Sequence, residues 1–168
     1  MNKRIRQYVG LLAAVAAYYL IHEGAHLLYA VSIGAFKKVR FVGIGMQIDV
    51  YTEQMTQAQL GVFCLLGSVV ALFAAYVMVS LIGRIGKHSS RVVKACAYYI
   101  TVALLFIDPL YLSVLCGFFG GGDMNGISLL LPEVVARILY GVIFAVNGIV
   151  FVKIVLPRYK ASFAGESA

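Results

Sequence analysis

Two histidines and a glutamate form a His-Glu-x-x-His pattern at His22, Glu23 and His26. Residues four apart lie on one face of an α-helix, so both imidazoles can bind a single metal ion. Glu23 can then accept a proton from a water molecule on that ion and act as general base. Zinc, one ion per chain, is the expected metal, because catalytic zinc sites combine histidines with a carboxylate and leave one position open. Two alternatives are a pair of buried histidines satisfied by neighbouring helices and a pair that ligates haem.

The pattern lies within a long apolar stretch. From Gln7 to Phe36 the ionisable side chains, tyrosines apart, are those of His22, Glu23 and His26. A charged group at the centre of a bilayer costs at least about 2.5–3.5 kcal/mol on insertion scales. A bound metal offsets this cost, since it neutralises carboxylates and engages imidazoles, so the apolar setting favours a metal site.

Two tyrosines lie on the same helix face as the histidines. Tyr18 is four residues before His22, and Tyr29 is three residues after His26. Aromatic packing is the preferred interpretation for both tyrosines, with hydrogen bonding to the site or to a substrate carbonyl as the alternative.

The composition excludes an ordinary soluble domain. Of the 168 residues, 62% are hydrophobic and 12% are charged, and the mean hydropathy is +0.92; about a quarter of the residues are charged in an average soluble protein. The net charge of +7 comes from basic residues at the ends of apolar segments, where the positive-inside rule places them. The expected partner of these residues is therefore the lipid bilayer and not nucleic acid. The cysteines, three in number, are expected to be buried thiols and not a disulfide framework.

These features predict an all-α polytopic membrane protein, with residues 1–168 forming a single membrane-embedded domain. About four transmembrane helices are expected, at about residues 8–33, 57–82, 92–118 and 132–156. Residues 119–131 are expected to form a loop or re-entrant segment, and residues 160–168 to fray.

A short β-hairpin is expected between the first and second helices. The segment Val39–Tyr51 is rich in β-branched residues, alternates in part between apolar and polar, and has glycines where a turn would lie. Beside a metal that cleaves peptides, such a hairpin can offer a strand edge to an extended substrate. The alternative is a plain amphipathic connector.

Two further carboxylates lie next to residues that break regular structure. Asp108 precedes Pro109, and a proline in a membrane helix frees a backbone carbonyl and allows a kink. Asp108 can therefore satisfy that break, cap a half-helix or bind the metal. Asp123 ends the glycine run Gly120–Gly122, whose conformational freedom lets the backbone pass close to a site.

The layout of these motifs resembles the site-2 protease family of intramembrane zinc metalloproteases, and in particular its small members with a Gly-Asp motif. The resemblance implies that His22 and His26 are zinc ligands, that Glu23 is the general base, and that Asp123 is the third ligand. The longer Asn-x-x-Pro-x-Pro-x-Leu-Asp-Gly pattern of that family is absent from this chain. Asn125, two residues after Asp123, is a candidate for binding the substrate backbone, with a simple turn as the alternative.

The function implied by this resemblance is hydrolysis of peptide bonds in or near transmembrane segments of membrane-protein or membrane-peptide substrates. The zinc-bound water would be the nucleophile and Glu23 its base. Water must reach the site, so a polar cavity between the first, third and fourth helices is expected. The alternatives are a non-proteolytic metal- or haem-binding membrane protein, a transporter, and an inactive membrane scaffold.

The rise of a helix favours Asp123 over Asp108 as the third ligand. At about 1.5 Å per residue, the two histidines lie roughly 21–27 Å beyond Tyr8, toward the end of the first helix. Asp123 follows the third helix as it arrives on the same side, whereas Asp108 is expected about 15 Å deeper, beyond the reach of a ligand. A strong kink at Pro109 would shorten that gap.

The lysines and arginines predict how the chain is oriented. They precede the first helix, separate the second helix from the third, and follow the fourth. Both termini are therefore expected on the cytoplasmic side of a bacterial cytoplasmic membrane, with Lys37, Lys38 and Arg40 as exceptions on the outer side.

Overall fold

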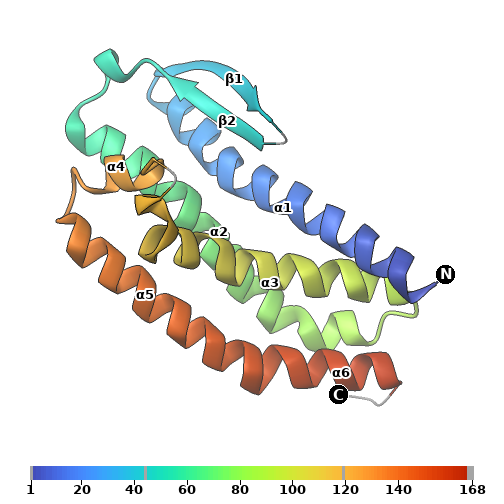
Figure 1. Cartoon of the computed structure of the whole chain (residues 1–168). Coiled ribbons are helices and arrows are strands. Elements are labelled where there is room, and N and C mark those ends of the chain that lie inside the picture. Colours follow the sequence, from blue (N-terminus) through green and yellow to red (C-terminus); the bar gives the residue numbers. More distant parts are fainter. Residues whose placement is uncertain (1, 44, 119, 166–168) are drawn as a thin grey trace.

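Four helical segments are long and apolar enough to cross a membrane. In this computed structural model, which describes residues 2–43, 45–118 and 120–165, they pack side by side along most of their lengths (Figure 1). They are α1 (Lys3–Ser32), α2 (Gln57–Gly86), α3 (Arg91–Ser113) and a continuous helix Glu133–Ala164. The prediction of an all-α membrane protein with four spanning helices is confirmed.

The last of these segments changes its helical type along its length. It comprises α5 (Glu133–Val150), a π-helical turn (Phe151–Val155) and α6 (Leu156–Ala164). Pro157 lies in the first turn of α6 and has no N–H to donate to the preceding turn, which is where regular α-helix gives way to the wider turn. The helix therefore continues to Ala164, through residues expected to fray, while residues 166–168 lie outside the described part.

Other helix ends also differ from those expected. α1 begins at Lys3, because the side chain of Asn2 accepts a hydrogen bond from the backbone N–H of Arg4 and caps the helix. α3 ends at Ser113 and not near residue 118. It is followed by a 3₁₀ turn (Leu115–Gly117), and the chain then passes through the glycines to the short helix α4 (Asp123–Ile127). Phe119, at the start of the expected loop segment, lies outside the described residues.

The expected β-hairpin is present between α1 and α2. Strands β1 (Phe36–Val42) and β2 (Gly45–Val50) pair in antiparallel register, and a 3₁₀ turn (Thr52–Gln54) leads from β2 toward α2. Figure 1 shows the hairpin folding back along the second half of α1. It therefore reaches the depth of the histidine pair and does not extend away from the helices.

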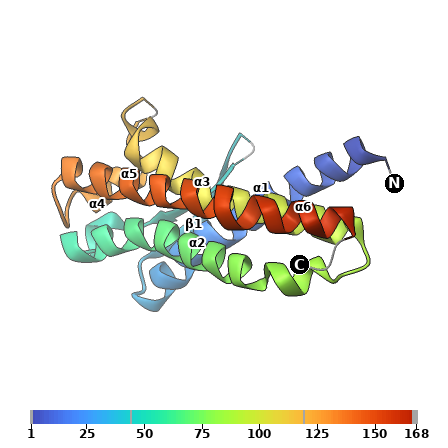
Figure 2. The same cartoon turned by 90° about the horizontal axis from the view of Figure 1, so that it is seen from below.

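The helices form three layers. α1 and the hairpin make one layer, α2 and α3 the middle one, and α5 with α6 the third, as the views in Figures 1 and 2 agree. α3 contacts α1, α2 and α5, so it is the central helix of the bundle. The start of α1 and the end of α6 lie at the same end of the molecule, where α3 also begins (Figure 1).

A proline in the middle of α3 is compensated by a side chain from α5. Pro109 has no N–H to donate to the carbonyl of Leu105, four residues earlier. Asn147 is fully buried, and its Nδ2 donates to that carbonyl at 2.6 Å, while its Oδ1 accepts from the Tyr76 hydroxyl at 2.8 Å. The break in α3 next to Asp108 is thus satisfied by α5 and α2, as a membrane interior requires.

Candidate metal centre

Three side chains from two distant parts of the chain converge at one point. The Nε2 atoms of His22 and His26 are 3.1 Å apart, and the Asp123 Oδ2 atom is 3.1 Å from the first and 3.6 Å from the second. A tetrahedral ion about 2.0–2.2 Å from each ligand would separate its ligands by about 3.3–3.6 Å. The three atoms are therefore spaced as ligands of one metal ion, and this buried group can hold one.

The other ring nitrogen of each histidine has its own acceptor. His26 Nδ1 lies 2.7 Å from the backbone carbonyl oxygen of Phe63, and His22 Nδ1 lies 3.2 Å from a carboxylate oxygen of Asp108. A carbonyl oxygen can only accept, so Nδ1 of His26 carries the proton, and Asp108 favours the same tautomer of His22. In the neutral rings both Nε2 atoms then present lone pairs toward Asp123.

The charge of Asp123 completes a set of acceptors. Its Oδ2 atom lies 3.1 Å from His22 Nε2 and 3.6 Å from His26 Nε2, and an ionised carboxylate can only accept. Two imidazole lone pairs and a carboxylate oxygen would repel one another without a positive centre among them. The donor set therefore fits a small cation, and its His₂-carboxylate composition is typical of zinc.

The backbone that brings Asp123 to the histidines depends on glycine. Gly120, Gly121 and Gly122 have φ values of +88°, +82° and +43°, which residues other than glycine rarely adopt. These residues turn the chain back toward the bundle after α3. α4 then packs on α2, where Gly126 lies so close to Cys64 that a Cβ atom would overlap the thiol. Asp123, at the start of α4, is thereby placed over the histidine pair.

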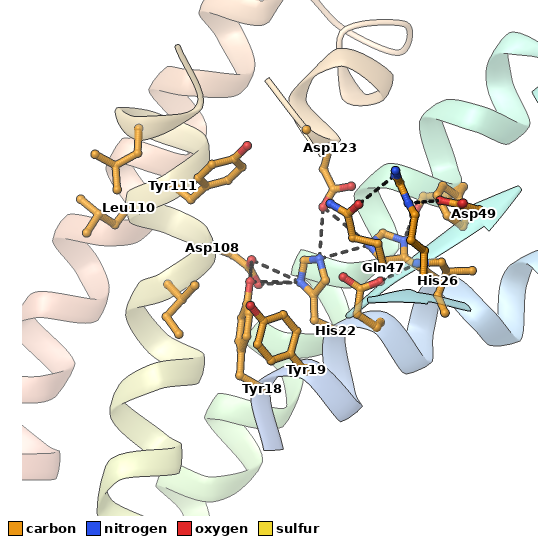
Figure 3. Close-up of a pocket in the computed structure, with 17 residues that line it drawn as sticks. Tyr18, Tyr19, His22, His26, Gln47, Asp49, Asp108, Leu110, Tyr111 and Asp123 are labelled. Carbon is orange, nitrogen blue, oxygen red and sulfur yellow. Dashed lines mark hydrogen bonds and ion pairs between the residues drawn. The ribbon is translucent and has the colours of Figure 1, made fainter. Parts of the chain in front are cut away.

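Asp108 lies on the other side of His22, as Figure 3 shows. Its side chain is 2% exposed and accepts a hydrogen bond from the Tyr18 hydroxyl at 2.5 Å, besides contacting His22 Nδ1. The expectation that Asp108 lies about 15 Å from the depth of the ligands is wrong. α3 ends five residues after Asp108, at Ser113, and the chain then turns back, so the two carboxylates reach similar depths.

Tyr18 has a polar contact as well as an aromatic one. Its hydroxyl donates to Asp108 and lies 3.4 Å from His22 Nδ1, and its ring packs against the His22 ring at 5.3 Å. Packing alone therefore does not describe Tyr18. It joins α1 to α3 at the level of the metal-binding group.

A glycine of α2 lies directly against the metal-binding nitrogens. A Cβ atom on Gly67 would be 2.5 Å from Nε2 of His26 and 2.6 Å from Nε2 of His22. Any side chain at this position would displace the imidazoles. No sequence motif marks Gly67, and its contact with the two rings follows from how α2 crosses α1.

Glu23 faces the same cleft as the metal-binding group. Its Oε2 atom accepts a hydrogen bond from the backbone N–H of Ile48 at 3.1 Å. This N–H belongs to β2 and points away from β1, so the outer edge of β2 faces α1. The hairpin therefore holds the Glu23 carboxylate at the wall of the cleft, about 13 Å before the end of α1.

The cleft has a volume of about 700 Å³. Its walls come from α1, the hairpin, α3 with the following turn, and Asp123, with Phe63 contributed by α2 (Figure 3). One part of the wall is polar: the Arg40 guanidinium contacts a carboxylate oxygen of Asp49 at 3.2 Å and the side-chain oxygen of Gln47 at 3.1 Å. The prediction that the fourth helix contributes to the cleft is wrong for the described residues: the lining includes the hairpin and no residue of Glu133–Ala164.

Asn125 lies away from this cleft. Its side chain is exposed, and Nδ2 donates to the backbone carbonyl of Gly120 at 3.4 Å, within its own loop. The described residues that line the cleft do not include it. In this structure Asn125 closes the turn that carries Asp123.

No protein-family model, no curated protein and no solved structure matches this chain. The described residues themselves contain a buried group of two histidines and one aspartate that can hold a metal ion. Glu23, Tyr18 and Asp108 line the same cleft as that group.

Proposed function

We propose that this chain is an intramembrane metallopeptidase of the site-2 protease type, with zinc held by His22, His26 and Asp123. The observation that best supports the proposal is that Glu23 lines the same cleft as the three ligand atoms. Zinc in such a site polarises a peptide carbonyl and lowers the pKa of water.

Glu23 is the general base in this proposal. Its carboxylate accepts the proton of the attacking water and passes it to the leaving amine. The hydrogen bond from Ile48 N–H sets the direction in which the carboxylate points, and the second carboxylate oxygen has no hydrogen-bond partner among the described residues. One oxygen is thus anchored and the other is available to water.

Asp108 and Tyr18 position His22. Asp108 accepts the Nδ1 proton and thereby directs the Nε2 lone pair toward the metal position, while the Tyr18 hydroxyl fixes the carboxylate. A carboxylate behind a ligating histidine orients the ring and makes the ligand more basic. The Phe63 carbonyl has the same role for His26.

The proposed substrate is a membrane protein or membrane peptide that enters the cleft in extended form. A helical peptide shields its own carbonyls with internal hydrogen bonds, so it must unwind before hydrolysis. The hairpin beside the cleft can pair with such an extended segment, but not through Ile48 N–H, which is already bonded to Glu23. Asn125 can contact the substrate backbone only if its side chain turns toward the cleft, away from the Gly120 carbonyl.

The decisive experiment compares two conservative variants of the purified protein. Wild type, Glu23→Gln and Glu53→Gln are purified in detergent, their metal content is measured, and each is incubated with a set of membrane-spanning peptides whose products are identified by mass spectrometry. Glu53 is the matched control, because it is an exposed acid in the turn after β2. We expect zinc in all three proteins and cleavage by wild type and Glu53→Gln only.

Three outcomes would contradict the proposal. Cleavage by Glu23→Gln at the wild-type rate would exclude Glu23 as the base. Zinc or haem bound at one equivalent, with no cleavage of any peptide by wild type, would favour a non-proteolytic metal- or haem-binding protein or a transporter. Absence of both metal and cleavage would favour a membrane scaffold.

A further inference from the structure

A second cavity lies at the opposite end of the bundle, where α1 and α3 begin. It has a volume of about 290 Å³. Its lining includes three cations, Lys3, Arg6 and Arg91, which we call the rim, and three aromatic side chains, Tyr98, Tyr99 and Phe163, which we call the floor. We call it the basic cavity. The proposed peptidase chemistry does not use any of these residues.

Positive charge in the basic cavity comes from side chains and from helix ends. Lys3 and Arg91 are the first residues of α1 and α3, and neither helix has an acid in its first turn. The N-terminal ends of both helices therefore add partial positive charge beside the three cations. The ion pairs of the described residues do not include Lys3, Arg6 or Arg91. Such a site attracts an anion.

The aromatic floor is closely packed. A Cβ atom on Gly10 would lie 2.5 Å from the Tyr99 ring, so α1 lies directly on that ring. Tyr98 makes edge-to-face contacts with Tyr99 and Tyr159, at 5.3 and 5.2 Å between ring centres. The floor thus offers an apolar surface beneath a charged rim, which suits an amphiphile better than a fully hydrated ion.

The position of the cavity along the helices indicates the kind of amphiphile. Exposed apolar side chains follow its cations by two residues: Tyr8 after Arg6 is 69% exposed, and Val93 after Arg91 is 42% exposed. Such a change from cationic to lipid-facing residues is typical of the boundary between headgroups and acyl chains. The rim therefore lies at headgroup level, and the surface below it at acyl-chain level.

We propose that the basic cavity binds the phosphate of an anionic phospholipid, with Arg6 and Arg91 as its main contacts. Basic pockets between transmembrane helices are suited to phospholipid headgroups, because they pair fixed cations with a phosphate at membrane level. Bound there, the lipid joins the start of α1 to the start of α3. These two helices also carry His22 and Asp108, but the proposal does not depend on peptidase activity.

The test uses a charge-matched pair of double variants. Arg6→Gln/Arg91→Gln removes two cations from the cavity, and Arg84→Gln/Lys87→Gln removes two exposed cations near the end of α2, at the same end of the bundle. Binding of phosphatidylglycerol and phosphatidylcholine to each purified protein is measured by native mass spectrometry, with and without inorganic phosphate. Wild type is expected to bind one phosphatidylglycerol in preference to phosphatidylcholine. The cavity variant is expected to bind phosphatidylglycerol about 10- to 30-fold more weakly, and the control variant less than about twofold more weakly.

The remaining outcomes decide against the proposal. Equal losses in the two double variants would mean that only the general surface charge attracts the lipid. Displacement of the lipid by millimolar phosphate would identify a site for the free anion. An unchanged thermal unfolding midpoint of the cavity variant shows that it is folded, so a loss of lipid binding cannot be attributed to unfolding.

Discussion

The metal centre and the basic cavity both include residues of α1 and α3, and they have opposite chemistry. At the metal centre two imidazole nitrogens and a carboxylate oxygen face one another within 3.6 Å, and the histidines are buried. At the basic cavity three cationic side chains stand around a rim, and two of them, Lys3 and Arg91, are exposed. The first arrangement suits a small cation held by short bonds, and the second suits a larger anion that keeps part of its hydration.

This difference predicts how each site responds to change. Buried ligands in low dielectric cannot be replaced by water, so loss of one of them has a large effect. The attraction of an exposed cation for an anion is weakened by solvent and partly replaced by neighbouring cations. The loss of one such cation therefore has a small and salt-dependent effect on binding. Four experiments test this contrast, in order of decreasing effect.

Removal of the third ligand is expected to have the largest effect. Asp123→Ala should lower zinc affinity more than about 100-fold. Mutation of a residue that only hydrogen-bonds to a metal ligand usually lowers metal affinity by about 10–100-fold. The measurement is a competition titration of the purified protein with a zinc chelator. Asp49→Ala is the control, because Asp49 is an acid of the same cleft that pairs with Arg40. A larger loss in Asp108→Ala than in Asp123→Ala would reverse the assignment of the third ligand.

A methyl group beside the histidines should also weaken metal binding. Gly67→Ala places a Cβ atom within 2.6 Å of both Nε2 atoms, so the rings must move away from Asp123. Gly83→Ala is the matched control in the same helix, since a Cβ atom there meets nothing within 4 Å. We expect zinc content below one equivalent only in Gly67→Ala, measured by elemental analysis at equal protein concentration. Full zinc content in that variant would show that α2 can move aside.

The positioning of His22 should show a smaller, graded effect. Asp108→Asn keeps a hydrogen-bond acceptor for His22 Nδ1 but loses the charge, and it is expected to weaken zinc binding by about 10–100-fold. Tyr18→Phe removes one hydrogen bond to Asp108 and should weaken it less than tenfold. The rank order of the dissociation constants is the observation to check. Zinc affinity equal to wild type in both variants would leave Asp108 with a structural role only.

A change in ionic strength should affect ligand binding at the two sites differently, and this is the smallest of the expected effects. Raising the salt concentration from 0.05 to 0.5 M shortens the screening length from roughly 14 to 4 Å. Phosphatidylglycerol binding at the exposed rim should fall severalfold, while zinc binding among buried side chains should change little. Equal sensitivity of both would contradict the view that one site is buried and the other lies at the surface. Chloride is replaced by acetate in a parallel series to exclude anion-specific effects.

The properties that the sequence alone determined are local ones. Apolar segments of sufficient length predicted four spanning helices, and the glycine-bearing β-rich segment predicted the hairpin, because both depend on neighbouring residues. The spacing of His22 and His26 predicted a common face, since helical periodicity sets that geometry before any packing occurs. Gly120–Gly122 predicted a backbone that bends, and all three glycines have positive φ.

The properties that depend on contacts between distant segments were decided only by the tertiary structure. The distance from Asp108 to His22 depends on where α3 ends and how it packs on α1, and a straight-helix estimate missed both. The hairpin forms a wall of the cleft because β2 folds back onto Glu23, which no local pattern indicates. Gly67 faces the imidazoles because α2 crosses α1 there. The rise of one helix gives a position along that helix, whereas packing against a second helix sets which atoms meet.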